Sequence, residues 1–600
     1  MILWVFIFCY STGFTQNIQL KSKFEKIEIK EDSTFINEIS ILFKKSDAHR
    51  LYPIFYDTEL EKVSNIRLYA KKGRRLKKLP VKDIIETDAK LDYITSKKIK
   101  SVIIPPNKEV KLIYTVTCKE LMYFSSLHFF SYNEIDTLAY QIKVPKKFEF
   151  AHHTIHKDAL PFYSIDSTKT NTTAIWTIKV APLKVKPDPM QLFGIYKNMK
   201  VPLMRTLVMP SSYKSHPIKY MNDWYYKNTA SSKGLNALAK RKIDELTVDV
   251  TDTMALVHII YKYIKNNFKY VAIEIGMGAF IPSHVNDVFI NKQGDCKDLS
   301  NLLSEALLYK GIKNDIALAA TFDHITDCDF PSLSSANHVI CVAYVKGKKI
   351  LLDPTDPIHR EGTPVQSLQK RTIFIINDNG GSFYKAINFS PKQNEISYQL
   401  NLNADSNNMS LEGTFDVTYN GISGNYLKRY QANESKPEFE NYGKLHFEKI
   451  LGNQSITNFI VPNKNEQLHF KGNISINGKI FNDGKHKYVL LDYLPSLVET
   501  ESRETLLEGT YLKNPFRKKV SVKLNLDEPI ELFKAIKHNY KGNGISLEIK
   551  ISAISNTEIQ CNYDFIFNHI FINKENINKT NEVLKSFNKI INEPIILKKQ

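Results

Sequence analysis

A cysteine flanked by acidic residues is the sharpest chemical feature of the sequence. The segment GDCKD at 294–298 contains Cys296 and precedes a leucine-rich run, which predicts a helix from about 296 to 310. Backbone N–H groups at a helix start are unpaired and lie at the positive end of the helix dipole. This position stabilises a thiolate, so Cys296 is a candidate nucleophile; the alternative is a small, inert buried residue.

A thiolate nucleophile also needs a base that a second group orients. His338 opens the strand-like run HVICVAYV, and Lys346-Gly347-Lys348 predicts the turn that leads into KILLDPT. Pairing about this turn gives partners whose numbers sum to about 693, which brings His338 beside Asp353 or Asp356. A carboxylate there can accept a hydrogen bond from one imidazole nitrogen and leave the other nitrogen for the thiol. Cys296, His338 and Asp353 are therefore a candidate catalytic set, with Asp356 as the alternative third member.

The residues around this set resemble a known enzyme family. The run YVAIEIGMGAFIPSHVNDVFINKQGDCKDLSNLLSEALLYKGI, followed by NHVICVAYV and LLDPT, is similar to the transglutaminase-like core of the papain-like cysteine enzymes. More narrowly, the chain resembles exported bacterial proteins in which that core lies between an N-terminal β domain of unknown function and a C-terminal β domain. The resemblance implies that Cys296 is the nucleophile, that His338 is the general base and acid, and that Asp353 orients the imidazole. It also implies a thioester intermediate, which an amine resolves by transamidation and water resolves by hydrolysis.

Three residues near the core are weaker candidates. Gln293 could be a second donor to an oxyanion, and Tyr270 and His284 could line the cleft. Turn, packing or surface roles are the alternatives for all three.

The hydrophobic period changes along the chain and so predicts its organisation. Alternation from about 16 to 190 predicts an N-terminal antiparallel β-sandwich, and the Pro-punctuated stretch 191–214 predicts a linker. Helical spacing followed by short strands places the transglutaminase-like core at 215–380. Alternation then returns and predicts a C-terminal β-rich domain at 381–600 with a terminal helix. The predicted fold class is therefore multidomain α+β.

The N-terminus indicates export. Residues 1–15, MILWVFIFCYSTGFT, are uncharged and largely apolar, which predicts a signal peptide; a buried strand is the alternative. We therefore expect an exported protein, periplasmic or extracellular, without an integral membrane span in the mature chain. Removal of Cys9 leaves an odd number of cysteines, of which Cys328 and Cys341 could pair across a loop.

Composition excludes some functions and leaves two. The chain carries 82 Lys and Arg against 63 Asp and Glu, a net charge of +19, yet it shows no aromatic–basic interleaving, so nucleic-acid binding is not expected. No CxxC pair or Asp-rich loop is present, and no metal or organic cofactor is expected. The first function is a cysteine enzyme acting on amide bonds of a protein, peptide or cell-wall substrate, with hydrolysis (a protease or amidase) favoured over transamidation. The second is a non-catalytic binding or assembly scaffold that uses its β domains and retains the core as a structural relic.

Overall fold

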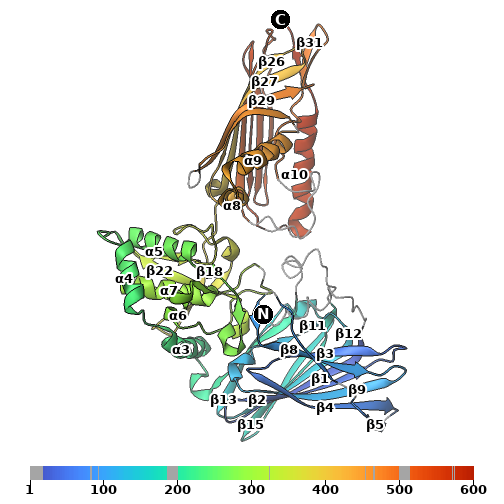
Figure 1. Ribbon diagram of the computed structural model, residues 1–600. Helices are drawn as coiled ribbons and strands as arrows, with labels where there is room; N and C mark the ends of the chain where they lie inside the picture. The colour runs from blue at the N-terminus through green and yellow to red at the C-terminus, as the bar shows by residue number, and fades with distance from the viewer. Residues whose placement is uncertain are drawn as a thin grey trace. The chain divides into compact units, whose positions relative to one another are not determined.

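The computed structural model describes residues 18–73, 75–81, 84–91, 93–184, 201–322, 324–452, 454–463, 467–498, 514–570, 572 and 574–600. It divides into two compact units, Met1–Ile387 and Asn388–Gln600, each described below by itself (Figure 1). The predicted signal peptide at 1–15 lies outside the described residues. No helix within these described ranges combines the length and the apolar character that crossing a membrane requires.

The first unit begins as a β-rich region and continues with helices around a second sheet. Its strands are β1 (Gln19–Ile29), β2 (Phe35–Phe43), β3 (Arg50–Asp57), β4 (Glu61–Lys72), β5 (Arg75–Leu79), β6 (Ile85–Asp88), β7 (Ile94–Thr95), β8 (Lys97–Ile104), β9 (Glu109–Cys118), β10 (Ser126–His128), β11 (Phe130–Ser131), β12 (Glu134–Pro145), β13 (Phe148–Ile155), β14 (Phe162–Lys169), β15 (Thr173–Ala181), β16 (Leu183–Lys184), β17 (Leu203–Pro210), β18 (Lys269–Tyr270), β19 (Ile273–Glu274), β20 (Gln293–Gly294), β21 (Asn314–Ala319), β22 (His338–Val345), β23 (Lys348–Leu352), β24 (Thr372–Ile376) and β25 (Ser382–Lys385). Its described helices are α3 (Pro217–Thr229), α4 (Ala237–Leu246), α5 (Thr253–Asn267), α6 (Val285–Asn291) and α7 (Cys296–Tyr309).

The largest sheet of this unit is mixed. Its order among the described strands is β14-β15-β12-β1-β2-β9-β4-β5, and β1 runs parallel to β12 while the other neighbours are antiparallel. Alternate side chains of the central strands, such as Ile27, Ile41 and Leu112, are buried, which explains the period-two pattern. Strand β17 pairs with β10 and β13 in a smaller sheet and is buried along most of its length, so residues 203–210 are not part of a linker.

The predicted fold class is wrong. The structure is mostly β, with 45% strand and 23% helix, and its described residues show no clear central helical papain-like core, so the expected α+β layout with sandwich domains is only partly supported. The N-terminal sheet contains a parallel pair, and the described helices of the first unit do not form a clear central helical core. They belong instead to the same compact unit as the N-terminal sheet. Periodicity predicts whether a segment is a strand but not which distant strand it pairs with, and this explains the error.

A five-stranded antiparallel sheet among the described residues carries the helical part of the unit. Its order is β23-β22-β21-β24-β25, with α7 against β22. Leu303 and Leu307 of α7 pack with Cys341 and Ala343 of β22 in one hydrophobic cluster, and the other face of the sheet forms a second cluster around Ile340. Burial on both faces makes this sheet a rigid support for the start of α7.

The second unit is built on another mixed sheet. Its strands and helices are β26 (Glu395–Asp405), β27 (Ser410–Tyr419), α8 (Asn425–Asn433), α9 (Lys436–Ile450), β28 (Ser455–Ile460), β29 (Leu468–Asn477), β30 (Ile480–Asn482), β31 (His486–Val489), β32 (Phe516–Asn525), β33 (Ile536–Gly542), β34 (Ile545–Ser555), β35 (Glu558–Phe567), α10 (Lys574–Asn592) and β36 (Ile595–Lys598). The order of the described strands in its main sheet is β28-β29-β27-β26-β32-β35-β34-β33, and β26 runs parallel to β32. Phe447 of α9 contacts Phe470, and Phe587 of α10 contacts Tyr563, so both helices cover one face of the sheet (Figure 1).

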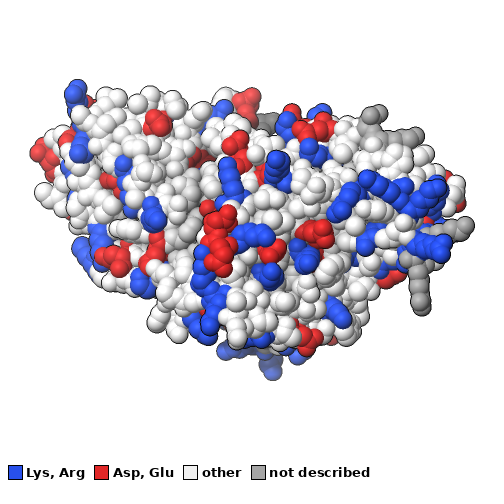
Figure 2. All heavy atoms as spheres, turned by 90° about the horizontal axis from the view of Figure 1, so that it is seen from below, with Lys and Arg blue, Asp and Glu red and all other residues white. Residues whose placement is uncertain are grey.

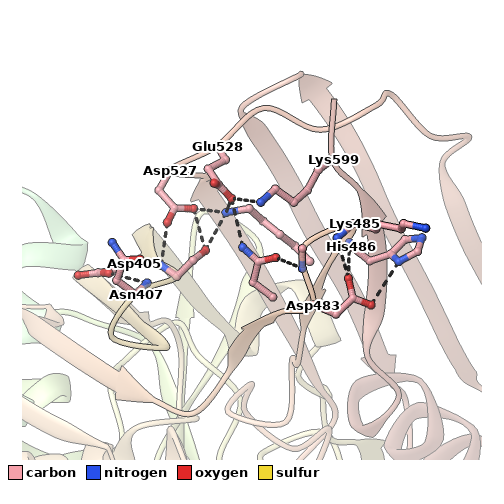
Figure 3. Close-up of polar contacts among 12 residues, drawn as sticks. Asp405, Asn407, Asp483, Lys485, His486, Asp527, Glu528 and Lys599 are labelled. Carbon is pink, nitrogen blue, oxygen red and sulfur yellow. Dashed lines mark hydrogen bonds and ion pairs between the residues drawn. The ribbon is translucent and has the colours of Figure 1, made fainter.

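A buried lysine contacts several polar side chains at one end of the second unit, among them Asp527 and Glu528 (Figure 3). The side chain of Lys487 has 0% exposure, and its Nζ contacts Ser406 Oγ at 2.7 Å, Glu528 at 3.0 Å and Asp527. Glu528 also pairs with Lys599 at 2.9 Å. The ammonium therefore has a partner for each of its donors, which offsets the cost of its burial.

Candidate active site

The start of α7 is built by a reciprocal cap. Asp295 precedes the helix and accepts hydrogen bonds from the amides of Lys297 and Asp298 at 3.1 and 3.3 Å, while Asp298 Oδ2 accepts from the Asp295 amide at 3.2 Å. Gly294 packs so closely that a Cβ there would lie 2.6 Å from the Cβ of Asp298. The GDCKD segment thus fixes the helix start, and Cys296 is its first residue.

A buried ion pair lies beside the thiol. The side chains of Lys297 and Asp295 are in contact and are only 5% and 6% exposed. Lys297 Nζ also donates to the backbone oxygen of Ile273 at 3.2 Å. Burial raises the pKa of Asp295, and the charge of Lys297 opposes that rise. Lys297 therefore compensates the buried carboxylate that caps the helix.

The hairpin β22–β23 brings a histidine to an aspartate. Cys341 pairs with Leu352 and Val345 with Lys348, so the predicted register about Lys346-Gly347 is confirmed. His338 begins β22 and Asp353 follows β23, and His338 Nε2 lies 2.8 Å from Asp353 Oδ2. The two side chains are 11% and 3% exposed.

Burial and charge act in opposite directions on this pair. Burial disfavours the imidazolium, but the charge of Asp353 and the hydrogen bonds to Asp353 and Cys296 raise the pKa of His338 well above its usual range. Burial likewise disfavours the carboxylate, but His338 and the hydrogen bond from Thr355 lower the pKa of Asp353. The favoured state of the pair is therefore imidazolium with carboxylate.

Cys296 lies near the imidazole ring of His338. Cys296 contributes to the raised pKa of His338, which indicates that its sulfur lies near the imidazole. Because Nε2 faces Asp353, the second ring nitrogen, Nδ1, is the one available to the sulfur. Ser300 Oγ donates to the Val339 backbone oxygen at 3.0 Å and fastens α7 to the strand that carries the histidine. The structure places His338 against Asp353 and Cys296 at the start of the helix that packs on the strand of His338.

Two residues that were not predicted from the sequence, Thr355 and Tyr261, form hydrogen bonds with Asp353. The amide and hydroxyl of Thr355 donate to Asp353 Oδ1 at 3.0 and 2.7 Å. The hydroxyl of Tyr261, on α5, donates to the Asp353 backbone oxygen at 2.6 Å and contacts His359 Nδ1 at 2.6 Å. Thr355 could have been predicted, because an aspartate in a turn often accepts a hydrogen bond from the residue two positions later. No sequence signal links Tyr261 to Asp353, which lies 92 residues away.

The weaker candidates make contacts other than a hydrogen bond to His338. Asp356, the alternative third member, accepts from the Ile358 amide at 3.0 Å, whereas His338 contacts Asp353. His284 caps α6 through the Asn286 amide at 3.2 Å. Gln293 is exposed on β20, and Tyr270 is 50% exposed on β18. After burial, Cys296 is the next cause of the raised pKa of Tyr270, so this ring lies near the sulfur.

The cysteines differ in their access to solvent. Among the described residues Cys296 is partly exposed, while Cys118, Cys328, Cys341 and Cys561 are buried and free, so the expected 328–341 pairing does not form. Burial raises the pKa of Cys118, Cys328 and Cys561 to about 12. Among the cysteines of the described chain, only Cys296 combines solvent access with an influence on the pKa of an imidazole.

Comparisons with known proteins show the fold. No protein-family model matches the chain, and no curated protein matches it. The crystal structure of a candidate protease from Parabacteroides distasonis is similar with a TM-score of 0.58 and 13% identity, covering 97% of this chain and 99% of that one. A candidate cysteine protease from Cytophaga hutchinsonii matches at a TM-score of 0.17 and 12% identity, covering 59% of this chain and 88% of that one. The first likeness shows that the overall fold is one already seen in a solved structure.

Proposed function

We propose that this chain is an exported cysteine enzyme that cleaves amide or peptide bonds through Cys296, His338 and Asp353. The single observation that carries the proposal is the buried His338–Asp353 pair at 2.8 Å, with Cys296 near enough to contribute to the raised pKa of His338. The placement of that thiol on the first residue of α7 supports it further.

The proposed reaction begins with the sulfur and the imidazolium as an ion pair. The thiolate attacks the carbonyl carbon of the substrate amide, and the Cys296 amide, which has no partner among the described residues, donates to the developing oxyanion. His338 then gives its proton to the leaving nitrogen, the C–N bond breaks and a thioester forms. Asp353 keeps the ring oriented and stabilises its charge throughout.

The thioester is resolved by the second reactant. In hydrolysis, neutral His338 takes a proton from water, the hydroxyl attacks the thioester carbon, and the thiolate leaves. In transamidation a lysine-type amine takes the place of water. We favour hydrolysis and a protein, peptide or cell-wall substrate, outside the cytoplasm as the apolar residues 1–15 suggest.

The test is site-selective labelling of the full-length chain. Iodoacetamide at neutral pH should label Cys296 faster than the four buried cysteines, as mass spectrometry of the tryptic peptides would show. Cys296→Ala should abolish release of ammonia or of new amino termini from amide and peptide substrates, whereas Cys561→Ala in the second unit should retain it.

The alternative, a non-catalytic scaffold, predicts the opposite result. Slow labelling at Cys296, together with equal partner binding by wild type and Cys296→Ala, would favour that function. Release of ammonia with incorporation of an added amine would instead identify a transamidase.

A further inference from the structure

One hairpin of the first unit carries a concentrated positive charge. Residues 67–82, RLYAKKGRRLKKLPVK, contain eight Lys or Arg and no Asp or Glu. They span the end of β4 and all of β5, where Lys71 pairs with Leu76 and Tyr69 with Lys78. Many like charges in so short a hairpin repel one another and so favour an anionic counterpart.

The hairpin lies at the edge of the large mixed sheet. β5 is the last strand of that sheet, and Arg75, Leu76, Lys77 and Lys78 are all exposed. In Figure 2, Lys and Arg side chains gather at the right of the view, on the side where β5 lies in Figure 1. The charge is therefore displayed to solvent.

Some basic residues elsewhere in the first unit are neutralised by ion pairs. Lys23 pairs with Glu25 at 2.6 Å, and Lys44 pairs with Asp136 at 2.7 Å. Arg75, Lys77 and Lys78, by contrast, form no ion pair with any residue in the described ranges. Within the hairpin, Arg67 pairs with Glu38 at 3.6 Å, so the uncompensated charge is that of β5.

An apolar side chain is exposed among these charges. Leu76 is 47% exposed, shares one face of the hairpin with Lys71 and Lys78, and follows Arg75 directly. A dissolved polyphosphate has no apolar surface for such a leucine, whereas the boundary between lipid headgroups and acyl chains accepts both the leucine and the ammonium groups.

We propose that the β4–β5 hairpin binds the surface of a membrane that contains anionic lipid. Arg75, Lys77 and Lys78 contact the negatively charged headgroups, and Leu76 enters the interface between them. The interaction is peripheral and holds the first unit at the surface by electrostatic attraction.

Protection of an exposed sheet edge is the competing explanation for lysines on β5, since charge discourages edge-to-edge association. The two explanations differ in what the removal of charge does. Membrane binding predicts weaker attachment to anionic vesicles, whereas edge protection predicts self-association without any change in attachment.

The experiment is co-sedimentation of the full-length chain with vesicles of phosphatidylcholine, with and without phosphatidylglycerol. The wild type should bind the anionic vesicles and not the neutral ones, and added salt should weaken this binding. Arg75→Gln/Lys77→Gln/Lys78→Gln should weaken it about a hundredfold, because each basic residue near an anionic surface contributes roughly a fivefold increase in affinity. Leu76→Ser should cause a smaller loss that salt does not change.

A matched control lies on the edge of the other large sheet. Lys537→Gln/Lys541→Gln/Lys550→Gln removes the same charge from the exposed hairpin β33–β34 and should leave vesicle binding within about twofold of wild type. Equal losses in both triple variants would show that net charge alone attracts the chain and would overturn the proposal. Binding of the wild type to RNA or to a soluble polyanion in preference to the vesicles would overturn it as well.

Discussion

Each of the two units contains a histidine–aspartate pair, and the nitrogen–oxygen distances of the two pairs are nearly equal. His338 Nε2 lies 2.8 Å from Asp353 at the end of β22, and His469 Nε2 lies 2.6 Å from Asp416 on β29 and β27. In the first pair the side chains are 11% and 3% exposed, and in the second 40% and 34%. Cys296 contributes to the raised pKa of the first ring, whereas Asp416 is shared with Lys471 at 3.3 Å.

The difference shows that contact distance does not make a site. Water screens the charges of the exposed pair, so its two members influence each other weakly. Burial removes that screening from His338 and Asp353 and so strengthens their interaction. Near the first ring there is also a thiol that can serve as a nucleophile. Burial and the third partner, rather than the pair itself, distinguish the candidate active site.

The largest expected effect comes from removing one carboxylate charge. Asp353→Asn should lower kcat/KM roughly a thousandfold or more, because the ring loses its orienting acceptor. The charge of Asp353 also helps to raise the pKa of His338, so the alkaline limb of the pH profile should move to lower pH in any residual activity. Asp416→Asn is the control. A comparable loss there would break the distinction between the two pairs.

The second-largest effect concerns stability and compares Lys297, near the first pair, with Lys471, near the second. Lys297→Met leaves the Asp295 carboxylate buried without its cation and should reduce the free energy of unfolding by about 3 kcal/mol. Asp295→Asn/Lys297→Met removes both charges while keeping a side-chain oxygen for the cap, and should recover part of that loss. Lys471, whose side chain is 52% exposed, serves as the control, because Lys471→Met should change stability by less than about 0.5 kcal/mol in urea unfolding.

The smallest effect is in the pH dependence of stability. The folded-state pKa of His338 is raised, so its contribution is fully present below the unfolded pKa of about 6.5 and is lost as pH rises through the folded value. The stability difference between wild type and His338→Gln should therefore shrink by on the order of 1–2 kcal/mol between acidic and alkaline pH. Urea unfolding across that range measures it. His469→Gln, in the exposed pair, should change the free energy of unfolding by less than about 0.5 kcal/mol.

Much of the candidate site could be predicted because its signals are local. The helix start at Cys296 follows from capping residues within a few positions, and the hairpin register follows from a single turn at Lys346-Gly347. The contact of Lys297 with the Ile273 backbone oxygen could not be predicted, because Ile273 lies on a strand 24 residues earlier. The contact of Tyr261 with Asp353 depends in the same way on the packing of α5.

The sequence by itself determined where strands and helices form, and which cysteine begins a capped helix, because backbone periodicity and capping act over a few residues. Only the tertiary structure decided that β1 lies parallel to β12, that the fold is mostly β, and that one histidine–aspartate pair is buried beside a thiol while its counterpart is exposed to water. These outcomes depend on how distant surfaces pack to exclude solvent, and that exclusion is a property of the whole folded unit.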